Sequence, residues 1–314
     1  MTRGSNRLAG PNRQRGVAII TAMIIVAIVA IIATDLAWNT ALDVRRTRML
    51  LLRDQAVQVA VGAESWVASI LRQDMIDSET DHLGEIWASD LPPLPIDGGE
   101  VFGVIEDLQG RFNVNNLISG NGDVDEPTLE QFQRLLSSLQ LDPRYAGIIA
   151  DWLDPNQDAA FPDGAEDPIY TGRVPPYRAA NQLLSSIGEL AAIDGMEKVV
   201  FDTLEPHIVA LPGRTPINVN TATPAVLQSL DESISPGDVE RLISERELAG
   251  FSSLENAFSS LVQPDQINTL SESSNYFLLT VIVRIDTVRV TLYSVLQRGP
   301  QGTVSTILRS LGTV

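Results

Sequence analysis

The chain opens with a polar stretch that passes directly into a long run of apolar residues. Residues 17–33 contain no charged side chain, and Thr21 is their only polar residue. As a helix this run would be about 26 Å long, close to the ~30 Å hydrocarbon thickness of a bilayer. Arginines precede it and Asp35 follows it. The pattern predicts one membrane-spanning helix over residues 17–38, with a cytoplasmic N-terminus.

Apolar positions continue at helical spacing beyond the membrane run. They recur from Leu52 to Leu71, charged residues occupy the opposite face, and no proline interrupts the segment. This periodicity predicts one amphipathic helix that continues from about residue 17 to residue 75. A break into two helices near Asp35 remains the alternative.

Strand patterns lie at both ends of a mostly helical middle. A proline-rich connection at 91–100 precedes two short predicted strands within 100–117, around a turn at Gln109-Gly110. Residues 276–298 predict two antiparallel strands that turn near 285–287. Helical patterns cover 126–140, 142–153, 178–194 and 196–205. The expected fold class is α+β, with a long N-terminal helix packed on a small antiparallel sheet and a large inserted helical domain.

Composition narrows the possible chemistry. The chain has no cysteine, which excludes disulfides and thiol catalysis, and its net charge of −18 disfavours binding to nucleic acid. His82 and His207 are its only histidines. It carries none of the serine-hydrolase, zinc-protease or phosphate-loop motifs. We therefore expect no enzymatic activity and no catalytic residues.

Gly16 lies at the near end of the apolar run, whereas a signal-peptidase site would lie at the far end. Cleavage between Gly16 and Val17 would remove the basic leader, residues 1–16, and retain the helix. This arrangement resembles a type IV prepilin, which implies cutting by a prepilin peptidase and N-methylation of Val17. The alternative is a plain signal anchor with a chance glycine.

Thr21 stands at the fifth mature position, where prepilin-like proteins usually carry glutamate. A carboxylate inside a bilayer is costly, and these filaments tolerate it because it pairs with the terminal amine of a neighbouring subunit. A subunit with no neighbour above it would gain nothing from that acid. The missing carboxylate at Thr21 therefore suggests a subunit at the tip of a fibre.

The stretch "DWLDPNQDAAFPDGAEDPIY", residues 151–170, is the densest group of acids. Asp154, Asn156 and Asp158 have the alternate spacing with which a loop can surround a hard cation. Ala159 and Ala165 occupy the positions where an EF-hand requires glycine and glutamate. A calcium-binding loop is predicted, and a solvated acidic loop is the alternative.

Residues 217–258 resemble the helix-hairpin-helix units of DNA-uptake and repair proteins, which open on Asn-x-Asn-Thr-Ala. In those units a Gly-apolar-Gly hairpin presents backbone N–H groups to a phosphate. Here Asp231 and Glu232 occupy the hairpin and the glycine pair is absent. We expect a helical scaffold that binds no nucleic acid. A membrane-anchored nucleic-acid-binding protein is the remaining alternative of that class.

Taken together, these stretches resemble the K-type minor pseudopilins of the bacterial type II secretion system. The resemblance covers most of the chain and is carried, after the leader, by "GRFNVNNL", "IIADWLDPNQDAAFPDGAEDPIY", "PPYRAANQLLSSIGEL", "INVNTATPAVLQSL" and "YFLLTVIVRI" in that order. It implies a single-pass inner-membrane protein with a periplasmic globular part. A minor tip pilin of a type IV pilus, serving adhesion or DNA uptake, is the runner-up.

The resemblance also implies partners and a metal. The protein would join I-type and J-type minor pseudopilins at the tip of the periplasmic pseudopilus, beside an H-type or major G-type pseudopilin. There it would initiate fibre assembly on the inner-membrane secretion platform and support export of folded proteins across the outer membrane. The resemblance further implies calcium in the helical domain, with ligands carried over as Asp154, Asp158, Asp163, Glu166 and Asp167.

The expected domains follow from the resemblance and the strand positions. Residues 1–16 are the leader and 17–38 the transmembrane part of the helix. Residues 39–118 are the first part of the pseudopilin domain, 119–272 the inserted helical domain, and 273–314 the C-terminal strands.

Overall fold

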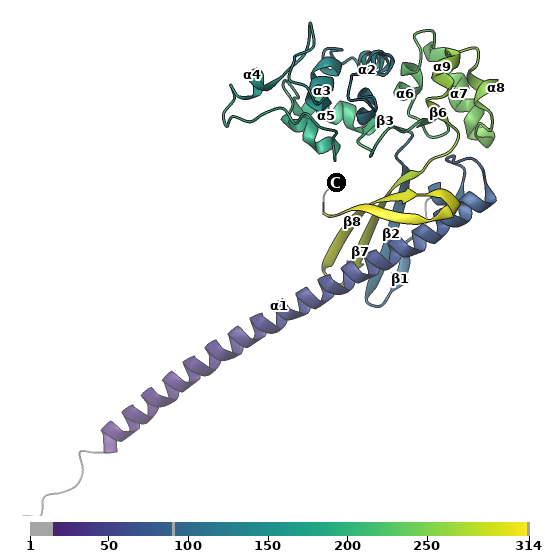
Figure 1. Ribbon diagram of the computed structural model, residues 1–314. Coiled ribbons are helices and arrows are strands. Elements are labelled where there is room, and N and C mark those ends of the chain that lie inside the picture. Colours follow the sequence, from purple (N-terminus) through teal and green to yellow (C-terminus); the bar gives the residue numbers. More distant parts are fainter. Residues whose placement is uncertain (1–14, 90–91, 313–314) are drawn as a thin grey trace, which may run out of the picture. The chain divides into compact units, whose positions relative to one another are not determined.

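The computed structural model describes residues 15–89 and 92–312, so most of the predicted leader lies outside the described residues. Figure 1 shows a long helix, an antiparallel sheet and a helical region. The chain divides into two compact units, residues 1–55 and 56–314.

A single helix confirms the longest prediction. Helix α1 runs without a break over Arg15–Asp77, 63 residues. Every side chain between residues 17 and 41 is exposed, and by length and composition this segment can cross a membrane. Thr34 and Thr40 donate their hydroxyls to the carbonyls of Ala30 and Leu36. The hydroxyls of these two threonines, which follow the apolar run, are therefore satisfied by the helix itself.

The second unit is built on a five-stranded antiparallel sheet with the order β1-β2-β7-β8-β9. The predicted hairpin is confirmed: β7 and β8 pair from Tyr276 with Gln297 to Ile285 with Val288. The strands are β1 (Leu94–Ile96), β2 (Gly99–Asp107), β7 (Tyr276–Ile285), β8 (Val288–Arg298) and β9 (Val304–Leu311).

The last part of α1 packs on this sheet through one face (Figure 1). Buried residues recur along this face at intervals of three to four: Ala56, Ala60, Glu64, Val67 and Leu71. Glu64 lies in the same stripe and is 5% exposed. It binds side chains of β8 and β9, so the packing face combines apolar burial with one anchored charge.

A helical region follows β2 and ends before β7, as predicted. Phe112 and Phe132 stack in its core with ring centroids 4.9 Å apart. Two pairs of two-residue parallel strands frame it, β3 (Phe112–Asn113) with β4 (Ile208–Val209) and β5 (Ile217–Asn218) with β6 (Leu270–Ser271). Its helices are α2 (Glu126–Ser138), α3 (Tyr145–Leu153), α4 (Asp167–Tyr170), α5 (Lys198–Leu204), α6 (Pro224–Ser229), α7 (Pro236–Ala249), α8 (Leu254–Phe258) and α9 (Pro264–Ile267).

Three local predictions are wrong. The proline-rich connection contains strand β1, and the predicted β2–β3 hairpin does not form because β3 pairs with β4. The predicted helix at 178–194 is irregular up to residue 186 and then forms the 3₁₀ helix η3, Ile187–Ala192. Side chains hold its backbone instead: Ala179 donates to Asp167, and Leu184 donates to Asn115.

Candidate functional site

The predicted processing position lies in the first turn of α1, which begins at Arg15. The hydroxyl of Thr21 lies 3.0 Å from the carbonyl oxygens of both Val17 and Ala18. Thr21 is therefore satisfied by its own helix. It presents no charge to a neighbouring subunit, in contrast to the glutamate expected at this position.

Beyond the membrane-length run, α1 keeps large apolar side chains exposed. Val44 is 62% exposed and Leu51 is 64% exposed, although they lie outside the most apolar segment. They are seven residues apart and therefore share one face of the helix. An exposed apolar face of this kind marks a protein or membrane interaction surface.

The acidic loop divides into buried and exposed carboxylates. Asp154 and Glu166 are each 2% exposed, whereas Asp158 is exposed and Asp163 is half-buried. Asp167, also half-buried, accepts a hydrogen bond from the N–H of Ala179. The five predicted ligands thus do not share one environment, and only Asp154 and Glu166 reach the interior.

Asp151, which was not among the predicted ligands, joins the two buried acids. It is 1% exposed, on the last turn of α3. Its Oδ2 atom accepts from the N–H of Ala160 at 3.0 Å. The sequence does contain one signal for Asp151 as a ligand: it is an acid within the apolar helix "YAGIIADWL". A buried helix face carries a carboxylate only where a partner binds that carboxylate.

These buried acids are not neutralised by the protein groups around them. Asp151 Oδ1 and both carboxylate oxygens of Glu166 have no hydrogen-bond partner among the described residues. Burial, with the nearby charges of Asp151 and Asp154, raises the pKa of Glu166 to about 7. Unpaired buried carboxylates are costly, so the donor set and its charge fit a hard cation.

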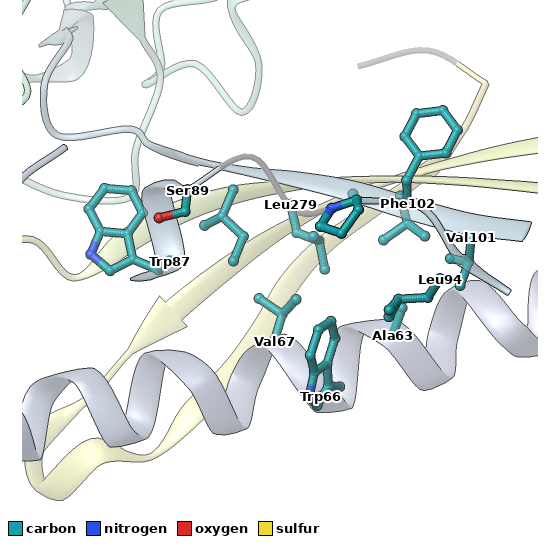
Figure 2. A pocket seen from close by; sticks show the side chains of 13 residues that line it. Ala63, Trp66, Val67, Trp87, Ser89, Leu94, Val101, Phe102 and Leu279 are labelled. Atoms are coloured by element: carbon teal, nitrogen blue, oxygen red, sulfur yellow. The ribbon is translucent and has the colours of Figure 1, made fainter. Parts of the chain in front are cut away.

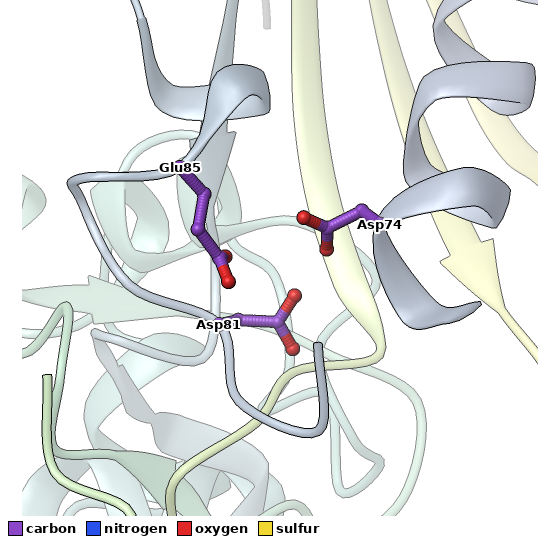
Figure 3. A group of neighbouring side chains, drawn as sticks. All are labelled: Asp74, Asp81 and Glu85. Atoms are coloured by element: carbon purple, nitrogen blue, oxygen red, sulfur yellow. The ribbon is translucent and has the colours of Figure 1, made fainter. Parts of the chain in front are cut away.

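The carboxylates that the structure brings closest together lie elsewhere. Asp74, Asp81 and Glu85 each offer an oxygen, and these atoms lie within 4.8 Å of one another. Figure 3 shows Asp74 on α1 and the other two on the loop that follows, with their side chains pointing toward one another. This group could hold a metal ion. The spacing of these acids along the chain matches no familiar metal motif, so this group could not be predicted from the sequence.

In the helix-hairpin-helix-like segment, side chains accept hydrogen bonds from the backbone N–H groups that a DNA-binding hairpin would offer to a phosphate. The N–H of Ser233 donates to Asp231 Oδ1 at 2.9 Å. Ser235 and Asp238 form a capping box at the start of α7, each accepting the other's N–H. The amides nearest the hairpin are thus already bound.

An apolar pocket lies between α1, the 3₁₀ helix η1 (Ile86–Ala88) and the sheet (Figure 2). It offers about 50 Å³, against the ~300–1,000 Å³ typical of small-molecule sites. Trp66 from α1 and Trp87 from η1 line it. We interpret it as a packing gap between helix and sheet.

Comparison with known proteins agrees with this architecture. Residues 110–213 and 217–277 match two family descriptions that both read "Type II secretion system (T2SS), protein K". The type II secretion system protein K of Pseudomonas aeruginosa is 34% identical, over 95% of this chain and 93% of its own length. The corresponding protein of Aeromonas hydrophila is 31% identical, over 91% and 94%.

The fold is also found in a solved structure. A chain in the crystal structure of the GspK-GspI-GspJ complex from the enterotoxigenic Escherichia coli type 2 secretion system superposes with a TM-score of 0.73 at 24% identity. The match covers 86% of this chain and 100% of that one. With relatives above 30% identity across nearly its whole length, the chain belongs to the type II secretion system protein K family, the K-type minor pseudopilins.

Proposed function

We propose that this chain is the subunit at the tip of the periplasmic pseudopilus, where it assembles with I-type and J-type minor pseudopilins. The family match over 95% of the chain carries the proposal. The relative of known structure is described as part of a complex of K, I and J proteins, which supports the choice of partners. Members of this family are pseudopilins, which are structural components of the secretion system.

The proposed mechanism is mechanical. Residues 17–38 of α1 would anchor the subunit in the inner membrane after cleavage between Gly16 and Val17, with the globular part in the periplasm. The apolar face bearing Val44 and Leu51 would pack on the equivalent helices of its partners. Thr21 would leave the helix start without the charge that recruits a further subunit. The tip complex would then seed growth of the fibre on the secretion platform.

The family also implies calcium in the helical domain, and we propose that the buried part of the acidic loop binds it. Asp151, Asp154 and Glu166 would hold the ion, because their burial and unpartnered oxygens leave negative charge to be neutralised. Asn181 Oδ1 also has no partner in the part of the chain that the structure describes, and it could complete the oxygen set. When bound, the cation would supply structural stability. Asp158, Asp163 and Asp167 would contribute at the loop surface.

Intact mass of the membrane-extracted protein tests the processing step. With an active prepilin peptidase we expect a mature chain that begins with N-methyl-Val17, and without the peptidase the full precursor. The Gly16→Ala substitution should block cleavage, and Gly10→Ala serves as a control within the leader. A chain that keeps its leader beside an active peptidase would mean a plain membrane anchor.

Cysteine cross-linking tests the partners, since the chain has no cysteine of its own. Val44→Cys should cross-link to cysteines on the apolar helix faces of co-expressed I-type and J-type subunits. Arg46→Cys is the control, because its exposed side chain lies on the opposite side of the helix. Equal cross-linking from both positions would contradict packing through the apolar face.

A further inference from the structure

The Asp74–Asp81–Glu85 cluster is separate from the acidic loop and has no part in the proposed mechanism. Its side chains are largely buried: that of Asp81 is 1% exposed, that of Glu85 10% and that of Asp74 11%. Carboxylates rarely reach this burial without a compensating partner. The three carboxylates of this cluster therefore require hydrogen-bond donors and positive charges that compensate their burial.

Protein donors occupy one side of each carboxylate. Arg298 binds Oδ2 of Asp74 at 3.1 Å and also binds Oδ2 of Asp81, which accepts from the N–H of Ser274 at 2.7 Å. Oε2 of Glu85 accepts from the indole N–H of Trp87 at 2.7 Å and from the N–H of His82 at 3.1 Å. These contacts fix the orientation of all three groups.

The buried Oδ1 atom of Asp81 has no hydrogen-bond partner within residues 15–89 and 92–312. Figure 3 shows the Asp81 carboxylate beside those of Asp74 and Glu85, with the three side chains pointing toward a common space. A buried oxygen without a donor loses its hydration and receives nothing in return. It is an independent indication, beyond the acidity of the cluster, that a positively charged ligand belongs in this space.

The charges within the cluster do not balance. Arg298 supplies one positive charge to the Asp74 and Asp81 carboxylates, and its guanidinium also lies 5.0 Å over the ring of Phe277. His82 Nε2 lies 3.8 Å from Glu85 Oε1. Asp107 is nearby through Ser274 and adds a further buried acid, although its oxygens accept from Ser274, Thr221 and Asn218. A divalent cation would offset the excess negative charge.

We propose that Asp74, Asp81 and Glu85 form a second cation site, which binds one calcium ion at the base of the helical region. All the ligands are carboxylate oxygens, which favours a hard cation. Two oxygens bound to one calcium ion at about 2.4 Å lie at most about 4.8 Å apart, and the three ligand atoms meet that limit.

The ion would fasten three segments that meet at this point. Asp74 is on the last turns of α1, Asp81 and Glu85 are on the loop after it, and Arg298 ends β8. The N–H of Asp81 donates to the carbonyl of Glu272, and its carbonyl accepts from Asn218, at the edge of the helical region. A cation here would therefore hold the junction between the helical region and the helix–sheet part of the fold.

Calcium binding to the full chain in detergent tests the site. Equilibrium dialysis would use the Glu166→Gln variant as the background, because this substitution weakens calcium binding by the acidic loop. In this background we expect Glu85→Gln to weaken binding of one calcium ion by at least about tenfold. Glutamine at position 85 can still accept from Trp87 and His82, and near-ultraviolet circular dichroism would verify the fold. The matched control, Glu79→Gln, alters an exposed acid of the same loop and should change nothing.

Terbium provides a second, local measurement. A lanthanide in this site would lie close to Trp87, whose indole binds Glu85, and would emit when tryptophan is excited. We expect this emission to fall in Glu85→Gln and to persist in Trp152→Phe, which removes the tryptophan next to the acidic loop. The proposal is overturned if Glu85→Gln and Glu79→Gln bind calcium equally. It is also overturned if no calcium binds at millimolar concentration.

Discussion

At the scale of single residues, Glu64 links α1 to the sheet through its carboxylate. Its carboxylate accepts two hydrogen bonds from Arg309 at 2.8 and 2.7 Å, one from Ser294 at 2.9 Å, and one from Thr306. We expect Glu64→Gln to lower the free energy of unfolding by about 1–3 kcal/mol, because the amide leaves Arg309 without its charge partner. Denaturant titration of the full chain in detergent would measure this loss.

The exposed pair of Glu100 and Arg284, 3.1 Å apart, provides the matched control. Their side chains are 41% and 50% exposed, so Glu100→Gln should cost less than about 1 kcal/mol. Equal losses in the two variants would show that Glu64 does not anchor the helix.

The same carboxylate predicts a pH dependence. Burial alone would raise the pKa of Glu64, but hydrogen bonds from Arg309, Thr306 and Ser294 outweigh burial and leave the pKa below its ordinary value of 4.5. A lowered pKa stabilises the fold above the unfolded value, and this contribution is lost as pH falls through the folded pKa. The difference in unfolding free energy between the wild type and Glu64→Gln should be constant above about pH 6 and shrink below about pH 4. A difference that grows on acidification would contradict this assignment.

Residue patterns were informative where the side chain acts on its own backbone. The stretches "GRFNVNNL" and "INVNTATPAVLQSL" share an Asn-x-Asn spacing, and the first asparagine of each makes the same local bond: Asn113 accepts from the N–H of Asn115, and Asn218 from that of Asn220. Their distant partners could not be predicted, because the carbonyl of Gly213 and the carboxylate of Asp107 are brought near only by the tertiary fold.

At the scale of elements, α1 depends on a narrow buried face where it meets the sheet. Leu71 is fully buried, and its carbonyl accepts from Arg298. We expect Leu71→Ala to cost about 2–4 kcal/mol, through lost burial and the cavity left behind. Ile76→Ala, at a side chain that is 71% exposed, should change stability by less than about 1 kcal/mol. Guanidinium midpoints would compare the two, and similar midpoints would refute this packing.

Elements with strong periodicity were predictable, and elements specified by distant pairing were not. Helix α1 and the β7–β8 hairpin repeat their patterns over many residues, so local sequence identifies them. Strand β1 has three residues, two of them exposed, and becomes a strand only by pairing with β2. Strand β9 was missed for a related reason: its exposed edge position gives it little apolar alternation. The acids of the Asp74–Asp81–Glu85 cluster come from α1 and from the loop after it, and no local sequence pattern connects them.

At the scale of the whole molecule, charge and hairpin geometry together predict that the chain does not bind nucleic acid, despite the likeness of residues 217–258 to a DNA-binding unit. A net charge of −18 repels the phosphate backbone, and binding of that backbone supplies most nonspecific affinity. The hairpin amides that would receive a phosphate are bound by Asp231, Ser235 and Asp238.

In filter binding at about 50 mM salt, where electrostatic attraction is strong, the full chain should retain no duplex or single-stranded DNA. A helix-hairpin-helix protein with an intact glycine pair is the positive control. Retention that weakens with added salt would mean that a positive surface outweighs the net charge, and the segment would then have to be regarded as a nucleic-acid interface.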